Sequence, residues 1–174
     1  VLVGGGYVGV EVAKKACRYP HSTGDAFAVA IPLGHAIGRI GGFLGGCCFG
    51  TPSQVPWAVT YPSGSFAHLA QARAGLVAPE ALYALPVHPA PLYELVFDLG
   101  LFVMLWRMRG FFPQRGVLFR VYLASYASYR FIAEFFRGDS PRPDLGLKPI
   151  QVLLLVAALW YSRRVWQAWV ARKT

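Results

Sequence analysis

The sequence predicts an all-α fold, a polytopic bundle of transmembrane helices with a small extracytoplasmic cap between two of the spans. Of its 174 residues, 55% are hydrophobic and only 14% are charged, which is more apolar than most soluble domains. Apolar stretches also recur at lengths near the roughly 17 to 25 residues that cross a bilayer. Together these observations predict a single membrane domain over residues 1–174.

Four complete spans are expected, because four apolar stretches are separated by polar or charged connections. They cover residues 26–50, 89–106, 116–136 and 149–166. Residues 1–13 are also apolar, but they are too short to cross a bilayer alone, so we expect part of a cut span there. We expect no cleavable signal peptide, because a basic start, an apolar run and a small-residue cleavage site do not occur in that order.

The first apolar stretch also matches the Gly-x-Gly-x-x-Gly pattern of a dinucleotide-binding turn, at Gly4, Gly6 and Gly9. A Rossmann unit would continue through a helix to a second strand that ends in an acidic residue about 20 positions later. Asp25 has that spacing, but it precedes a long apolar stretch instead of ending a strand. We therefore favour a membrane segment over a nucleotide site.

The net charge of +9 raises the alternative of nucleic-acid binding, but the basic residues do not form one patch. Ten of them occupy every second connection, which by the positive-inside rule places those connections and the C-terminus in the cytoplasm. These ten are Lys14, Lys15, Arg18, Arg107, Arg109, Arg115, Arg163, Arg164, Arg172 and Lys173. The distribution favours membrane topology and argues against a nucleic-acid partner.

Residues 51–87 are rich in proline, serine and aromatic residues, too interrupted for a span and too apolar for a free linker. We expect a small cap with a short strand over 57–62 and an interfacial helix within 65–76. Trp57, Tyr61 and Tyr83 would lie at headgroup depth, where amphipathic rings gather.

The three cysteines do not predict a disulfide framework. Cys17 lies on the cytoplasmic side of this topology, while Cys47 and Cys48 are adjacent in sequence. They have no histidine or paired cysteine at zinc spacing, so we expect small residues for close helix packing and no metal or cofactor.

A glycine ladder occupies the second half of the first complete span, with glycine at every fourth position and Arg39 beside it. The ladder consists of Gly34, Gly38, Gly42, Gly46 and Gly50. Such spacing predicts a smooth stripe on which another helix backbone approaches closely. Arg39 lies one position off the stripe, so we expect it to point into a cavity, because a charge inside a membrane costs about 2.5 kcal/mol or more.

A second polar stripe lies near the outer end of the third complete span. Tyr126, Arg130, Glu134 and Arg137 stand at i, i+4, i+8 and i+11, which places them on one helical face. One interpretation is a structural pair of Arg130 and Glu134 that joins two helices. The other is an anion site in which two guanidiniums hold a phosphate while the carboxylate orients one of them or accepts a proton.

The segment HPAPLYE precedes the second complete span and supplies His88 and Glu94. A His-Pro pair at the start of a span fixes an extended turn, so His88 by itself suggests a structural role. Glu94 is suited to neutralise a nearby arginine.

Four segments in this order resemble the prolipoprotein diacylglyceryl transferase family: GRIGGFLGGCCFGTPSQVPWAVTYP, HPAPLYE, YRFIAEFFRGD and LGLKPIQVLLL. The resemblance implies the last four spans, and part of the third, of a seven-span enzyme of the bacterial cytoplasmic (inner) membrane. It implies transfer of a diacylglyceryl group from phosphatidylglycerol to the lipobox cysteine thiol of a prolipoprotein signal peptide. That reaction forms a thioether, releases glycerol phosphate and needs no cofactor.

The resemblance also assigns roles to residues. It implies catalytic roles for Arg39, Arg130 and Glu134, and phospholipid binding by Arg39, Gly50 and Arg130. The helical stripe adds Tyr126 and Arg137 to the expected phospholipid-binding residues. His35, His88 and Glu94 are candidate accessory groups. Four positions differ from the family pattern: Gly4 replaces a histidine proposed as base, Gly42 an asparagine, Cys47 a glutamate and Pro91 a glutamine.

These departures keep two alternatives to a transferase open. A non-catalytic phospholipid-binding or assembly protein would retain Arg39 and Arg130 while losing the polar groups at positions 4 and 47. A channel or transporter would use the glycine ladder as a packing seam and would need polar stripes along several spans. The sequence has two such stripes, so the transferase is the leading hypothesis.

Overall fold

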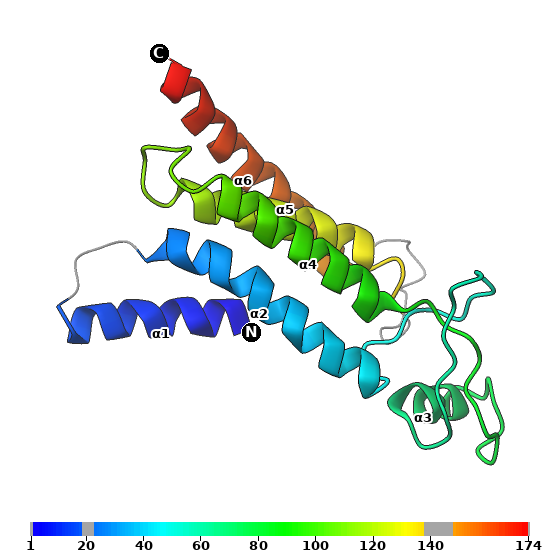
Figure 1. Ribbon diagram of the computed structural model, residues 1–174. Helices are drawn as coiled ribbons and strands as arrows, with labels where there is room; N and C mark the ends of the chain where they lie inside the picture. The colour runs from blue at the N-terminus through cyan, green and yellow to red at the C-terminus, as the bar shows by residue number, and fades with distance from the viewer. Residues whose placement is uncertain (1, 19–22, 138–147, 174) are drawn as a thin grey trace.

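The computed structural model describes residues 2–18, 23–137 and 148–173, and within these ranges the chain forms α-helices without a regular strand (Figure 1). The helices are α1 (Leu2–Ala16), α2 (Gly24–Leu44), α3 (Phe66–Arg73), α4 (Ala90–Arg107), α5 (Val117–Ala133) and α6 (Pro149–Lys173). The all-α prediction is confirmed. Its finer part, a bundle that crosses the membrane several times, stays a prediction.

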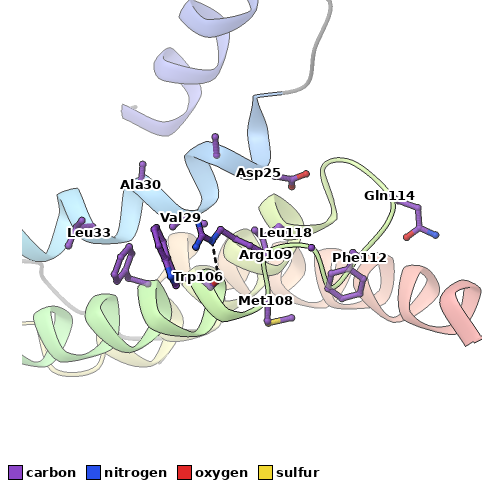
Figure 2. Close-up of a pocket in the computed structure, with 13 residues that line it drawn as sticks. Asp25, Val29, Ala30, Leu33, Trp106, Met108, Arg109, Phe112, Gln114 and Leu118 are labelled. Carbon is purple, nitrogen blue, oxygen red and sulfur yellow. Dashed lines mark hydrogen bonds between the residues drawn. The ribbon is translucent and has the colours of Figure 1, made fainter.

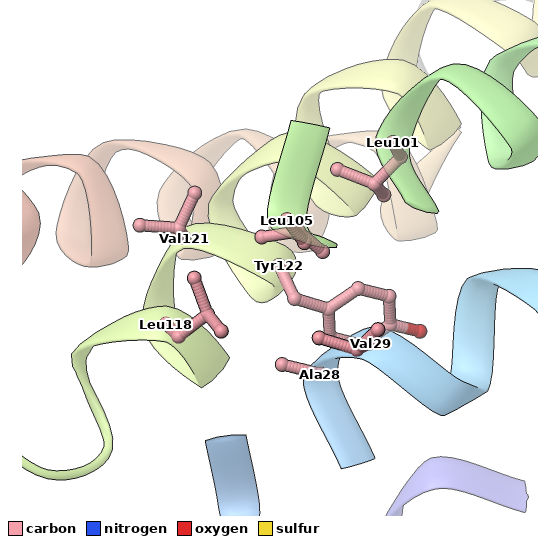
Figure 3. Close-up of a cluster of buried hydrophobic side chains, with 7 residues drawn as sticks. All are labelled: Ala28, Val29, Leu101, Leu105, Leu118, Val121 and Tyr122. Atoms are coloured by element: carbon pink, nitrogen blue, oxygen red, sulfur yellow. The ribbon is translucent and has the colours of Figure 1, made fainter. Parts of the chain in front are cut away.

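Three helices, α2, α4 and α5, pack together, and α6 lies along α5. In Figure 1, α2 runs toward the cap, α4 runs away from it and α5 returns. Their shared core contains side chains from all three helices (Figure 3): Ala28, Val29, Leu101, Leu105, Leu118, Val121 and Tyr122. In α4 and α5 their spacing of three or four residues directs them to one face, and α2 contributes the adjacent pair Ala28 and Val29. Burial of these side chains removes apolar surface from water.

Among the helices of the described ranges, α2 is the one that is both long and apolar enough to cross a membrane. It has 21 residues and a mean hydropathy of 1.4 over its most apolar window, of which 22% is buried. The expected spans 89–106 and 116–136 correspond to α4 and α5, each close to its expected bounds. The last helix, α6, continues to Lys173, seven residues beyond the expected end at 166.

The predicted span over 26–50 is too long at its C-terminal end, because α2 stops at Leu44. Gly46 and Cys48 have positive φ angles of 64° and 57°, and they turn the chain into the cap. Glycine adopts this left-handed conformation without steric cost and is unfavourable inside helices. The closely spaced glycines that extend the ladder therefore also end the helix.

The glycine ladder is not the packing stripe that its spacing suggested. An added Cβ at Gly34 or Gly38 would meet no described atom within 4 Å, and Gly46 and Gly50 lie beyond the helix. At Gly42 the nearest such neighbour is the Cys47 sulfur, 3.5 Å away. Within the described chain, then, the glycines do not bring a second helix against α2.

The N-terminal glycine motif lies inside a helix. Because α1 continues through Gly4, Gly6 and Gly9, these residues do not form the strand-to-helix turn of a nucleotide site. Asp25 has a structural role instead: its carboxylate accepts hydrogen bonds from the backbone N–H groups of Gly116 (2.7 Å) and Phe119 (3.1 Å). It thus caps the N-terminus of α5 from a neighbouring helix.

The cap between α2 and α4 contains α3, as expected for residues 65–76. The predicted strand over 57–62 makes only isolated antiparallel bridges, Val59 with Val87 and Pro62 with Tyr83, and is not a regular strand. A small core stabilises the cap: Phe49, Tyr61, Ala67, Ala84 and Val87. Tyr61 is therefore buried, whereas Trp57 and Tyr83, expected at the same depth, are exposed.

Candidate active site

Charged side chains from α2, α4 and α5 converge at the end of the bundle next to the cap. Arg39 comes from the last two turns of α2, Glu94 from the start of α4 and Arg130 from the last turn of α5. Because α4 runs opposite to its two neighbours, its beginning lies beside their ends. The sequence placed these charges in separate spans, and helix packing brings them together.

Glu94 is the centre of this cluster. Its Oε2 lies 2.5 Å from Arg39 Nε, and its Oε1 lies 3.7 Å from both Arg130 Nη1 and Arg137 Nη1. The Glu94 side chain is only 7% exposed. A buried carboxylate among three guanidiniums reduces their mutual repulsion, and removing it would leave uncompensated charge. We expected Glu94 to neutralise a nearby arginine, and in the structure it lies close to three.

Glu134 forms a second, adjoining ion pair with cations on both sides. Its Oε2 lies 3.1 Å from Arg130 Nη2, and its Oε1 accepts a hydrogen bond of 2.9 Å from Lys148 Nζ. The sequence analysis did not identify Lys148. Its position at the edge of the apolar run of α6 was an available signal, because a lysine beside a span needs a partner or water.

One guanidinium nitrogen of this cluster is available for a ligand. Arg130 Nη1 is buried and has no hydrogen-bond partner among the described residues; its nearest printed neighbour is Glu94 Oε1 at 3.7 Å. Buried donors are normally satisfied, so such a group calls for an explanation. An anion that binds between Arg39 and Arg130 would accept this hydrogen bond.

Gly50 positions the cluster through backbone packing. A Cβ at Gly50 would lie 2.5 Å from His88 Cβ and 2.8 Å from the Phe136 carbonyl oxygen. Its N–H donates to the His88 carbonyl (2.9 Å), and a bridge joins it to Arg137. The segments that follow α2 and α5 and precede α4 thus meet at a place that only glycine fits. A direct contact of Gly50 with lipid stays a prediction.

A second polar layer lies one helical turn deeper. One turn from Arg39, Glu94 and Arg130 stand His35, Asp98 and Tyr126. His35 Nδ1 and Asp98 Oδ1 are buried without a hydrogen-bond partner among the described residues, and the His35 and Tyr126 ring centres are 5.7 Å apart. Asp98 was missed, although its position four residues after Glu94 was a usable signal.

His88 belongs to the junction with the cap and not to the ion cluster. Its Nδ1 lies 3.1 Å from the Tyr93 hydroxyl, which also accepts a hydrogen bond of 2.7 Å from Trp57 Nε1. Its ring contacts Phe136 edge to face, with centres 5.6 Å apart. This environment favours the structural interpretation of His88.

Comparison with known proteins identifies a family for the chain. The family model for prolipoprotein diacylglyceryl transferase matches residues 2–168, nearly the whole chain and every residue of the ion cluster. The chain belongs to the prolipoprotein diacylglyceryl transferase family.

Relatives from several bacteria carry the name phosphatidylglycerol–prolipoprotein diacylglyceryl transferase. The protein of Cupriavidus metallidurans is 31% identical over 92% of this chain and 59% of its own length. That of Aeromonas salmonicida is 34% identical over 95% and 57%, and that of Pasteurella multocida 35% over 82% and 48%. The chain therefore spans about half the length of the curated relatives it matches.

Of the four positions that differ from the expected family pattern, two lie together in the structure and two lie elsewhere. Gly42 and Cys47 are neighbours: the Cys47 N–H donates to the Gly42 carbonyl (3.0 Å), and the sulfur lies 3.5 Å from where a Gly42 Cβ would be. Pro91 is buried in the first turn of α4, where proline is favourable. Gly4 lies in α1, which packs against no other helix in the described ranges.

Proposed function

We propose that the protein transfers the diacylglyceryl group of phosphatidylglycerol to the lipobox cysteine thiol of a prolipoprotein. One observation carries the proposal: three guanidiniums surround Glu94, and one of them keeps a buried donor that has no hydrogen-bond partner among the described residues. An anionic phosphate is the ligand that matches this arrangement. The names of the relatives supply the identity of the two substrates.

In the binding step, the lipid enters from the bilayer and places its phosphate between Arg39 and Arg130. Glu94 holds both guanidiniums in position beforehand, so little reorganisation is needed when the phosphate arrives. Tyr126, one turn below Arg130, would face the glyceryl part of the lipid. Arg137 adds positive charge at Glu94 Oε1, the same oxygen that Arg130 approaches.

In the chemical step, the thiolate sulfur attacks the glyceryl carbon that bears the phosphate. A C–S bond forms while the C–O bond breaks, and its electron pair passes to the phosphate oxygen, which leaves as glycerol phosphate. The phosphate changes from a monoanionic diester to a dianionic monoester, so its attraction to Arg39 and Arg130 increases in the transition state. This increase is their catalytic contribution.

The thiol proton must leave before or during the attack. Each oxygen of Glu134 already faces a cation, which favours an orienting role for this residue toward Arg130. His35 is better placed to accept the proton, because its Nδ1 has no partner among the described residues and it lies one turn from Arg39. His35 would then replace the histidine that is absent at Gly4.

We further propose that α2, α4, α5 and α6 cross the bacterial inner membrane, with the C-terminus in the cytoplasm. The outer face of α2 exposes large apolar side chains, as a lipid-facing helix would: Ile37, Ile40 and Leu44. The arginine-rich connection after α4 lies at the opposite end of the bundle from Glu94. The ion cluster would therefore lie toward the outer leaflet.

The test is conversion of a synthetic lipobox peptide in vesicles of phosphatidylglycerol, with the thioether product measured by mass spectrometry. We expect product with the unaltered full chain, and at least a 100-fold lower rate with Arg130→Ala. Arg107→Gln is the matched control, because it removes an exposed arginine at the other end of α4. A chain without activity whose phosphatidylglycerol binding depends on Arg130 would instead favour the non-catalytic phospholipid-binding alternative.

That alternative is supported by the pairing of Gly42 with Cys47, because both positions have lost the polar groups of the family pattern. The double substitution Gly42→Asn with Cys47→Glu discriminates between the two functions. If the chain only binds lipid, the variant gains turnover from an inactive background. If the chain is a transferase, product forms without the substitutions.

A further inference from the structure

A hollow lies at the end of the bundle remote from Glu94 (Figure 2). Its volume is about 770 Å³, within the range of sites for small organic ligands. It separates the N-terminal half of α2 from the C-terminal end of α4 and the loop that follows. Along α4, Trp106 in this hollow is twelve residues, or about 18 Å, from Glu94.

The walls of the hollow are largely apolar. Val29, Ala30 and Leu33 of α2 form one side, and Phe102 and Trp106 of α4 form the other, with Phe112 and Leu118 beyond them. In Figure 2, Val29 and Leu33 lie on the side of α2 that faces Trp106, whereas Ala30 points away from α4. Such a trough suits an alkyl chain, because its walls offer extensive apolar contact and few hydrogen-bonding groups.

A single cation lies at this trough. Arg109 turns back over Trp106, with its guanidinium carbon 3.2 Å from the ring centre and its Nε donating to the Trp106 carbonyl (3.1 Å). Stacking holds the guanidinium in place while its terminal nitrogens have no hydrogen-bond or ion-pair partner among the described residues. They are available to an anion.

The acidic residue of the lining, Asp25, forms no ion pair with Arg109 among the described contacts. It directs both carboxylate oxygens to the backbone of Gly116 and Phe119, where it caps α5. The trough therefore combines an apolar wall with a guanidinium whose terminal nitrogens are open to an anion. This combination matches an amphiphile with an anionic headgroup and a long acyl chain.

We propose that the hollow binds an anionic phospholipid of the cytoplasmic leaflet, with the phosphate at Arg109 and one acyl chain between α2 and α4. This inference rests on the proposed membrane orientation but not on transferase activity. In that orientation the arginine-rich connection faces the anionic leaflet, and Trp106 lies at headgroup depth. The lipid would act as a structural ligand between two helices that also carry Arg39 and Glu94.

Trp106 provides a direct readout, because bromine atoms on a lipid acyl chain quench a nearby indole. The full chain would be placed in nanodiscs of unlabelled phosphatidylcholine with increasing fractions of brominated-chain phosphatidylglycerol or brominated-chain phosphatidylcholine. The signal that disappears in Trp106→Phe reports on the hollow. We expect half-maximal quenching of this signal at a fraction of brominated phosphatidylglycerol about fivefold lower than the fraction of brominated phosphatidylcholine that is needed. A fivefold preference is about the attraction that one arginine near a membrane surface provides for an anionic lipid.

Arg109→Gln should abolish this fivefold preference, while Arg107→Gln, which removes an exposed arginine outside the lining, should retain it. Leu33→Phe should narrow the trough and weaken quenching by both lipids. Equal quenching by both lipids in the unaltered chain, equal effects of the two arginine substitutions, or no quenching of Trp106 at all would each overturn the proposal.

Measurements of transferase activity distinguish this lipid site from the substrate site at Arg39 and Arg130. Arg109→Gln should leave thioether formation at saturating phosphatidylglycerol within about twofold, and Arg130→Ala should leave the quenching of Trp106 unchanged. If the chain forms no thioether at all, the quenching experiment still decides the proposal. If Arg109→Gln abolishes thioether formation while the quenching preference remains, Arg109 belongs to the reaction and the assignment of a separate lipid site is wrong.

Discussion

The two ends of the α2–α4–α5 bundle are held together by different interactions. At the cap end, carboxylates and guanidiniums are buried together around Glu94, where each charge depends on its partners. At the other end, apolar packing and the Asp25 cap hold the helices, and Arg109 is exposed at a hollow. The cap end is arranged to receive charge at a cost in stability, whereas the far end provides stability. Substitutions at the cap end should therefore lower both the reaction rate and the stability, whereas substitutions at the far end should lower the stability alone.

The largest effect is expected for Glu94→Gln at the cap end. The change leaves Arg39, Arg130 and Arg137 without their shared carboxylate, and we expect a loss of about 3 kcal/mol in the free energy of unfolding together with at least a 100-fold lower rate. Thermal unfolding in detergent and the thioether assay measure the two effects. A variant with unchanged stability would contradict the view of Glu94 as the centre of the cluster.

Gly50→Ala should have the next largest effect. The added Cβ would overlap with His88 and the Phe136 carbonyl, so the segments that carry Glu94 and Arg137 must move apart. We expect a loss of about 1 to 3 kcal/mol, with a raised KM for phosphatidylglycerol. Gly64→Ala is an informative comparison, because its Cβ would meet no atom within 4 Å, although its positive φ adds backbone strain. An equal rise in the KM for phosphatidylglycerol in both variants would show that Gly50→Ala acts by general backbone strain alone.

Asp25→Ala tests the far end. Loss of the cap leaves the N–H groups of Gly116 and Phe119 without their acceptor, and we expect destabilisation by about 1 to 2 kcal/mol. The rate per folded molecule should remain unchanged, since the ion cluster is not affected. A lower specific activity at full folding would show that the two ends are coupled. Asp25→Asn, which retains one acceptor oxygen, should lose less.

The smallest effect concerns Tyr61 in the cap. Its hydroxyl is buried without a partner among the described residues, and burial, with a smaller contribution from Cys47, raises the pKa of this tyrosine above its usual value of 10.0. Tyr61→Phe should change stability by less than about 1 kcal/mol near neutral pH. The unfolded chain releases the tyrosine proton first, so the unaltered protein should lose stability relative to the variant as the pH rises above about 10. If the free energies of unfolding of the two proteins changed in parallel above about pH 10, this prediction would be wrong.

The sequence was informative where the decisive interactions are local. Spacing of four residues predicted that Arg130 and Glu134 share a face, and their ion pair at 3.1 Å agrees. The same reasoning failed for the glycine ladder, because equal spacing continued past Leu44 while the helix did not. Periodic spacing shows which residues share a face if a helix forms, but it does not show where the helix ends. The end of α2 depends on the turn at Gly46 and on the cap that surrounds this turn.

By itself, the sequence determined the helical class, the family resemblance and the few charges that an apolar chain retains at a cost. Which of those charges meet was decided by tertiary structure. Glu94 is distant in sequence from Arg39, and Lys148 from Glu134, so each pairing depends on how the helices pack. The reason is physical: the hydrophobic pattern is a property of one helix, whereas these two ion pairs need atoms from different parts of the chain to lie within a few ångströms of each other. For the same reason, Asp25 became a cap and Arg109 remained available.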